Sequence, residues 1–152
     1  MAQNYQESEI WYFKNKYPSA LFHDYIIKLG ITGARKTLRK LFLESDYDYL
    51  IMLDDDVQLT GQSGKLYLDQ IDSNPDSFIE NNRSRLNLFA ISRYIFEQHD
   101  FPDVDPEKED GFEDRIFFYT LCKKFPEAHK KFTNTQIKEY TLATRDPDST
   151  WY

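Results

Sequence analysis

The segment 49–57 constrains the fold most, because five apolar or aromatic residues run directly into three consecutive aspartates, Asp54, Asp55 and Asp56. An apolar run of this length is too short for a buried helix and lacks helical periodicity, so it predicts a fully buried β-strand. In open α/β sheets, ligands bind at the carboxyl ends of the strands. The segment therefore predicts a central strand that delivers carboxylates to a ligand site.

The three aspartates have two interpretations. Asp is a favoured turn residue, so the cluster fits an acidic turn that closes a strand. However, three adjacent carboxylates repel one another at neutral pH and need a cation or hydrogen-bond donors nearby. Strand side chains alternate between faces, and residues two apart are separated by about 6.6 Å along the strand. Asp54 and Asp56 are therefore expected to share one divalent cation, with Asp55 on the other face.

Composition narrows the class of protein. The chain has 152 residues, 26 acidic against 19 basic, and a formal net charge of -7, which argues against a nucleic-acid partner. The length predicts a single domain over residues 1–152. Cys122 is the single cysteine, so no internal disulfide is expected and a reducing compartment is favoured. No long apolar stretch or leader is evident, so we expect no transmembrane segment and a cytoplasmic location.

Helical and extended patterns alternate along the chain. Helical spacing is expected over residues 7–17, 32–45, 65–71 and 112–125, and extended segments over 20–27, 49–57, 86–94 and 137–143. Thr32 is expected to start the second helix, residues 61–64 to form a loop, and residues 99–111 to form an acidic loop. The alternation predicts an α/β fold, a single layered domain with a mixed, mainly parallel sheet.

Two motifs together give a family resemblance. Residues 30–57 read Gly-Ile-Thr-Gly-Ala-Arg-Lys, a helix, a polar turn and Tyr-Leu-Ile-Met-Leu-Asp-Asp-Asp-Val. This resembles the central part of GT-A type nucleotide-sugar glycosyltransferases (family 2-like), in which a Gly-rich turn and an Ala-Arg pair open the helix before the DxD strand. Residues 110–118, Asp-Gly-Phe-Glu-Asp-Arg-Ile-Phe-Phe, resemble the segment that starts a helix and supplies the catalytic base in many inverting members. The resemblance covers residues 30–125.

The resemblance implies a truncated GT-A-like domain that transfers a sugar, as a hexosyltransferase does, from a nucleotide-sugar donor to a carbohydrate, lipid or protein acceptor. Asp54 and Asp56 would bind Mn²⁺ or Mg²⁺, which neutralises charge on the departing nucleoside diphosphate. Asp55 would accept from a ribose hydroxyl or cap the turn. Arg35, near a helix N-terminus, would contact the nucleotide phosphates. Asp114 would be the general base, with Glu113 as its neighbour or a ligand of the acceptor.

The chain also departs from the family pattern. The usual first strand and acidic loop that hold the nucleobase are missing, so the chain is expected to be a fragment of a longer protein or a diverged domain. The usual Ala-Arg-Asn is Ala-Arg-Lys here. The late Gln-x-x-Arg-Trp motif of processive synthases is absent from the sequence, so processive polymer synthesis is not expected.

Other interpretations stay open. Haloacid-dehalogenase-type phosphatases also place Asp-x-Asp after an apolar strand, with the first Asp as nucleophile, although Gln58 stands where that motif normally has Thr or Val. A non-catalytic glycosyltransferase-like binding domain is the second alternative, and a homo-oligomer is compatible with the sequence. Arg35 also fits a solvated helix face, and Glu113 with Asp114 also fits the acidic first turn of a helix.

Overall fold

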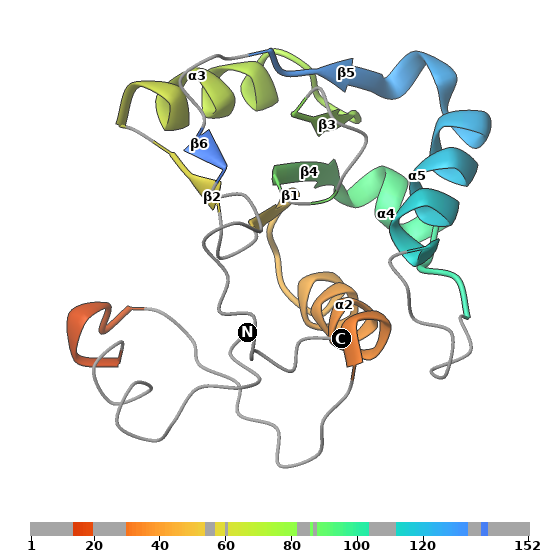
Figure 1. Ribbon diagram of the computed structural model, residues 1–152, viewed down its shortest axis with the longest axis horizontal. Helices are drawn as coiled ribbons and strands as arrows, with labels where there is room; N and C mark the ends of the chain where they lie inside the picture. The colour runs from red at the N-terminus through yellow and green to blue at the C-terminus, as the bar shows by residue number, and fades with distance from the viewer. Residues whose placement is uncertain are drawn as a thin grey trace.

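The computed structural model describes residues 14–19, 30–53, 57–59, 61–81, 86, 88–103, 112–133 and 138–139. In chain order the elements are α2 (Gly30–Leu43), β1 (Tyr49–Leu53), β2 (Val57–Gln58), α3 (Gly61–Asp72), β3 (Phe78–Glu80), β4 (Leu88–Ser92), α4 (Arg93–Gln98), α5 (Phe112–Lys124), the 3-10 helix η2 (Pro126–Ala128), β5 (His129–Lys131) and β6 (Lys138–Glu139). Helices α2, α4 and α5 lie on one side of the main sheet and α3 on the other (Figure 1). The described chain is thus an α/β structure, as expected.

The main sheet has four strands in the order β1-β4-β3-β5. β4 is antiparallel to both β1 and β3, whereas β3 and β5 are parallel, and β2 pairs antiparallel with β6 in a separate small sheet. The mixed sheet is confirmed, but the expectation of a mainly parallel one is wrong, because two of its three ladders are antiparallel. Only residues 81–87 join β3 to β4, and a parallel crossover needs a dozen residues or more.

Strand β4 forms the centre of the core, and all five of its residues are buried. Phe89 and Ile91 point to the side of α2, α4 and α5, while Leu88 and Ala90 point to the side of α3. This alternation is what a strand covered on both faces requires. The two sides of the sheet therefore carry separate apolar clusters with β4 between them.

Strand β1 is confirmed at residues 49–53, but its expected burial and central position are wrong. β1 is an outer strand of the described sheet. Met52 is buried in the cluster on the α2 side, whereas Ile51 and Leu53 on the opposite face are 39% and 50% exposed. Five adjacent apolar residues suggested burial on both faces, but one face of β1 is covered and the other is partly open.

Helix α3 begins at Gly61, so the loop expected over residues 61–64 is wrong. Ser63, Tyr67 and Ile71 are buried at four-residue spacing along one face of this helix. Packing of that stripe offsets the cost of Gly64, which is about 1 kcal/mol for a glycine inside a helix, while Gly61 is only the first residue of α3. Helix α2 likewise begins at Gly30, which places Thr32 inside its first turn rather than at its start.

The remaining expected elements are partly described. α5 spans Phe112–Lys124, in agreement with the helix expected over residues 112–125. Residues 14–16 are helical, while the rest of the expected helix over 7–17 and the extended segment over 20–27 lie outside the described residues. In the part of the chain that is described, no helix combines the length and the apolar character needed to cross a membrane.

Candidate functional site

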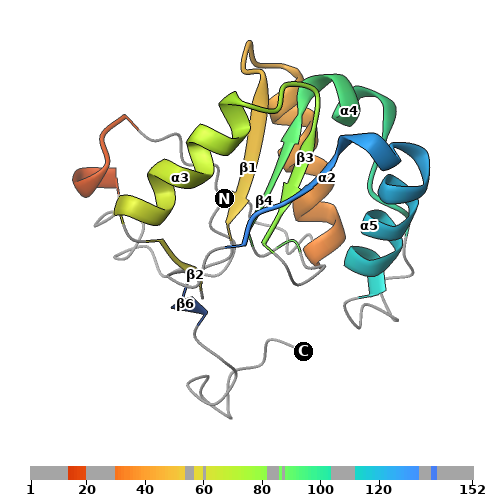
Figure 2. The same cartoon turned by 90° about the horizontal axis from the view of Figure 1, so that it is seen from above.

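The two ends of the main sheet are defined by the pairing of β1 with β4. Leu53 pairs with Leu88 at one end, here called the Leu53 end, and Tyr49 pairs with Ser92 at the other, the Ser92 end. Residues 44–48 join α2 to β1, so the helix and the strand run in opposite directions. Figure 2 shows the first turns of α2 and α5 at the Leu53 end.

The predicted metal ligands follow β1 directly. β1 ends at Leu53, and the next three residues, Asp54, Asp55 and Asp56, lie outside the described residues. Among the described side chains, no three of His, Cys, Asp and Glu form a group that would hold a metal ion. Because this finding does not extend to the aspartates, the metal assignment stays a prediction. Their carboxylate oxygens are the donor type that Mg²⁺ and Mn²⁺ prefer.

Arg35 joins α2 to the first turn of α5. Its Nη1 donates to Glu113 Oε1 at 3.0 Å and to Asp114 Oδ1, while its Nη2 donates to Asp114 Oδ2 at 3.2 Å. The side chains are 15% exposed for Arg35, 1% for Glu113 and 22% for Asp114. Two charge-assisted bonds to Asp114 fix the plane of that carboxylate as well as its position. Arg35 and the adjacent acids Glu113 and Asp114, which lie 78 and 79 positions further along the chain, are thus brought together at the Leu53 end.

This arrangement bears on the roles predicted for the three residues. Glu113 and Asp114 lie in the first turn of α5, where the helix dipole favours carboxylates. The guanidinium of Arg35 is engaged by these carboxylates, and its predicted contact with nucleotide phosphates stays a prediction. Glu113 Oε2 and Thr32 Oγ1 are buried and have no hydrogen-bond partner in the described chain. Within the cluster of Arg35, Glu113 and Asp114, Glu113 Oε2 is therefore a polar atom whose hydrogen-bonding capacity is not used.

A second polar cluster joins β3, α5 and β5. Glu80 Oε1 lies 3.1 Å from His129 Nε2, and His129 Nδ1 lies 3.9 Å from Cys122 Sγ. The His129 ring stacks on Phe78 with 5.1 Å between ring centroids. Burial raises the pKa of the Cys122 thiol, with the charge of Glu80 adding to the shift. The thiol is therefore protonated at neutral pH, which makes it a weak nucleophile.

A cavity of about 510 Å³ at the Ser92 end was not predicted from the sequence. Its lining combines the start of β1, the end of α3, the following turn and the start of α4: Asp48, Tyr49, Ile71, Asp72, Pro75, Asp76, Ser92, Arg93, Tyr94 and Glu97. Segments this far apart in sequence give no common spacing. The Asp-rich turn with Pro75 indicates turn chemistry only, and residues 92–94 were expected to be extended, not to begin a helix.

Comparison of the chain with protein-family models, with curated proteins and with solved structures gave no match.

Proposed function

We propose that this chain is a metal-dependent glycosyltransferase that moves a sugar from a nucleotide-sugar donor to an acceptor hydroxyl with inversion. The supporting observation is the cluster of Arg35, Glu113 and Asp114 at the Leu53 end of the sheet, where β1 leads into the three aspartates. Glu113 and Asp114, from the second motif of the family resemblance, thus lie at the end of the sheet where β1 ends and the three aspartates of the first motif follow. Ligands of open α/β sheets bind at such strand ends.

On the donor side, Asp54 and Asp56 would hold Mn²⁺ or Mg²⁺ through carboxylate oxygens. The bound cation would stabilise the negative charge that develops on the departing nucleoside diphosphate. Because successive side chains of an extended segment point to opposite faces, Asp55 would point away from the metal and accept a hydrogen bond from a ribose hydroxyl. Arg35 pairs with Glu113 and Asp114 near the first turns of α2, and a further contact of its guanidinium with the phosphates of a bound donor is part of this proposal.

On the acceptor side, Asp114 is the better general base of the two acids. Its side chain is 22% exposed and that of Glu113 is 1% exposed, so Asp114 is the carboxylate that an acceptor hydroxyl can reach. Asp114 takes the hydroxyl proton as the acceptor oxygen bonds to the anomeric carbon. The bond from that carbon to the diphosphate oxygen breaks, and the nucleoside diphosphate leaves with the electron pair. Arg35 fixes the orientation of the base through both of its oxygens.

The experiment that tests this proposal is a thermal-shift screen of UDP, GDP, CMP and sugar nucleotides, with and without Mn²⁺. One nucleotide class should stabilise the wild type only with Mn²⁺, by about 2.7 kcal/mol at 100 times its dissociation constant. Asp54→Asn and Asp56→Asn should lose this stabilisation. Asp69→Asn is the matched control, because Asp69 is an exposed acid paired with Lys65. Equal stabilisation of Asp54→Asn, Asp56→Asn and the wild type would overturn the metal assignment.

The second arm of the experiment measures sugar transfer or donor hydrolysis with the nucleotide sugar that binds. Asp114→Asn should lower the rate by about 10²-fold with little change in donor binding, which is the usual contribution of a positioned base. Asp103→Asn serves as the control, because Asp103 is an almost fully exposed partner of Lys36. Equal rates for Asp114→Asn and the wild type would leave Asp114 as a link between α5 and α2. Phosphorylation of Asp54 by a phosphate donor would favour the phosphatase alternative instead.

A further inference from the structure

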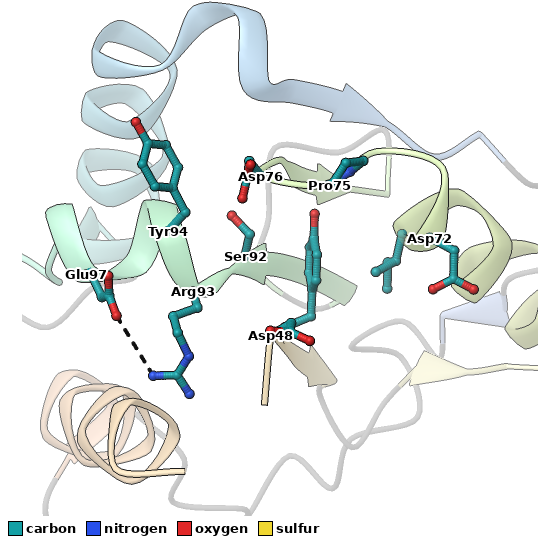
Figure 3. Close-up of a pocket in the computed structure, with 10 residues that line it drawn as sticks. Asp48, Asp72, Pro75, Asp76, Ser92, Arg93, Tyr94 and Glu97 are labelled. Carbon is teal, nitrogen blue, oxygen red and sulfur yellow. Dashed lines mark ion pairs between the residues drawn. The ribbon is translucent and has the colours of Figure 1, made fainter. Parts of the chain in front are cut away.

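The cavity at the Ser92 end has the size and composition of a small-molecule site. Its volume of about 510 Å³ falls within the range of roughly 300–1,000 Å³ that is usual for ligand pockets. Figure 3 shows its lining residues arranged between the turn after α3 and the start of α4. The apolar part of the lining comes from Tyr49, Ile71 and Pro75. The polar part is dominated by carboxylates, which indicates the charge of the ligand.

Three of these carboxylates have no basic partner among the residues that the structure describes. Asp48, Asp72 and Asp76 are exposed, and none forms an ion pair with another described residue. Asp72 is also the last residue of α3, a helix of 12 residues with no basic residue in its last turn. A helix C-terminus carries partial negative charge and favours a cation. The acids and the helix end therefore both favour a positively charged ligand.

Arg93 is the one base in the lining, and its charge is directed elsewhere. Its guanidinium donates to the carbonyl oxygens of Phe42 at 3.1 Å, Leu43 at 3.2 Å and Tyr47 at 3.0 Å. It also lies over the ring of Phe42, with 4.9 Å between Cζ and the ring centroid. Arg93 thus caps the end of α2 and holds α4 against it. Its only carboxylate contact in the cavity is with Glu97, at 4.0 Å.

Ser92 supplies a second and independent observation. It is the N-cap residue of α4, yet its side chain makes no capping hydrogen bond. Ser92 is 2% exposed, and its Oγ has no hydrogen-bond partner within the described residues. Figure 3 shows the hydroxyl on the Asp76 side of the cavity. A serine that forgoes the usual cap bond leaves a buried hydroxyl for a ligand to satisfy.

We propose that this cavity binds a small alkylammonium ligand, a diamine or polyamine. Its ammonium groups would pair with Asp72 and Asp76, and one N–H would donate to Ser92 Oγ. The alkyl chain would pack on Tyr49 and Pro75. A bare divalent cation fits less well, because the described carboxylates do not come together as a group of three ligands. The site is at the opposite end of the sheet from Arg35 and does not depend on the proposed glycosyl transfer.

The experiment titrates the full chain with 1,4-diaminobutane and with spermidine, using isothermal titration calorimetry and NMR. Saturable binding to a single site is expected. The double variant Asp72→Asn/Asp76→Asn should bind at least about tenfold more weakly, because it removes both charge partners. Ser92→Ala should weaken binding by about threefold without changing its salt dependence, because it removes a neutral acceptor. Circular dichroism of each variant checks that the fold is retained.

Two controls separate a built site from general attraction to an acidic protein. Asp69→Asn removes an acid of the same helix that is paired with Lys65 and does not line the cavity, so affinity should stay within about twofold of wild type. The uncharged 1,4-butanediol should not bind. Equal weakening by Asp69→Asn and by the double variant would overturn the proposal, as would unchanged binding in Ser92→Ala. Tighter binding of a lysine-containing peptide than of either amine would overturn the small-ligand assignment.

Discussion

At the Leu53 end of the sheet two carboxylates share one guanidinium, whereas at the Ser92 end three carboxylates line a cavity without a base of their own among the described residues. The first group is largely buried and the second is exposed. Buried carboxylates need their partner to be tolerated at all, so the first arrangement is fixed by packing. Exposed acids in a solvated turn carry no such requirement. At the Leu53 end the carboxylates are therefore used in ion pairs that hold the fold. At the Ser92 end the carboxylates are not used in this way, and they remain available to a ligand.

The largest expected effect tests the buried end. Arg35→Met keeps the aliphatic stem but leaves Glu113 buried without its guanidinium partner, and breaking a buried pair in this way costs about 3–5 kcal/mol. Urea unfolding should show this loss in the free energy of unfolding. Lys36→Met is the matched control on the next position of α2, because its partner Asp103 is 98% exposed. Its cost should be below about 1 kcal/mol. Similar losses for both variants would remove the distinction between the two ends.

The next effect tests how the frame of the cavity is held. Tyr49 Oη donates to the carbonyl oxygen of Asn74 at 2.6 Å and accepts from the backbone N–H of Ser77 at 3.1 Å. Tyr49→Phe removes both bonds and should cost about 1–3 kcal/mol, because the Ser77 N–H is left without an acceptor in a partly buried site. Tyr94→Phe is the control on the same cavity, since Tyr94 is 55% exposed. Equal unfolding midpoints for Tyr49→Phe and Tyr94→Phe would show that hydrogen bonds do not hold this frame.

The elements that could be predicted are those whose own apolar residues show the spacing of a helix or a strand. The helical spacing of residues 112–125 and the apolar run of residues 49–53 both correspond to observed elements. β3 and β5 were missed. β3 has only three residues, too few to show a pattern. β5 reads His-Lys-Lys and has no apolar pattern, and it joins the described sheet as an outer strand through backbone pairing. β5 is a strand because it pairs with β3, and the local sequence of β5 does not indicate that partner.

The candidate site shows the same division. Glu113 and Asp114 were predicted at the start of α5 from a local motif, and they lie in its first turn. Their contact with Arg35 links residues 78 and 79 positions apart, and no spacing in the sequence indicates it. Ser92 was equally hidden, because residues 86–94 were expected to be extended and the start of α4 at Arg93 was not predicted. In each case the unpredicted feature is a side-chain contact, or the lack of a usual contact. Both depend on how the helices and strands pack together.

The smallest expected effect separates backbone shape from charge at the Ser92 end. Asp76 has a φ of 59°, which lies in the left-handed region. Most residues with a Cβ avoid this region for steric reasons, whereas Asp tolerates it because its side chain can form a local hydrogen bond. Asp76→Ala should therefore cost about 1 kcal/mol, and Asp76→Gly should leave the free energy of unfolding within about 0.5 kcal/mol of wild type. Urea unfolding measures both.

Both Asp76 variants lose the same carboxylate, so their affinities for 1,4-diaminobutane should fall together although their stabilities differ. That outcome would assign the carboxylate to the ligand and the backbone conformation to the fold. If affinity instead follows stability, with Asp76→Gly binding as wild type does, the carboxylate is not a ligand and the turn conformation alone shapes the cavity. The Ser92 end would then depend on its backbone conformation and not on the Asp76 carboxylate, and the contrast between the two ends would rest on the hydroxyl of Ser92.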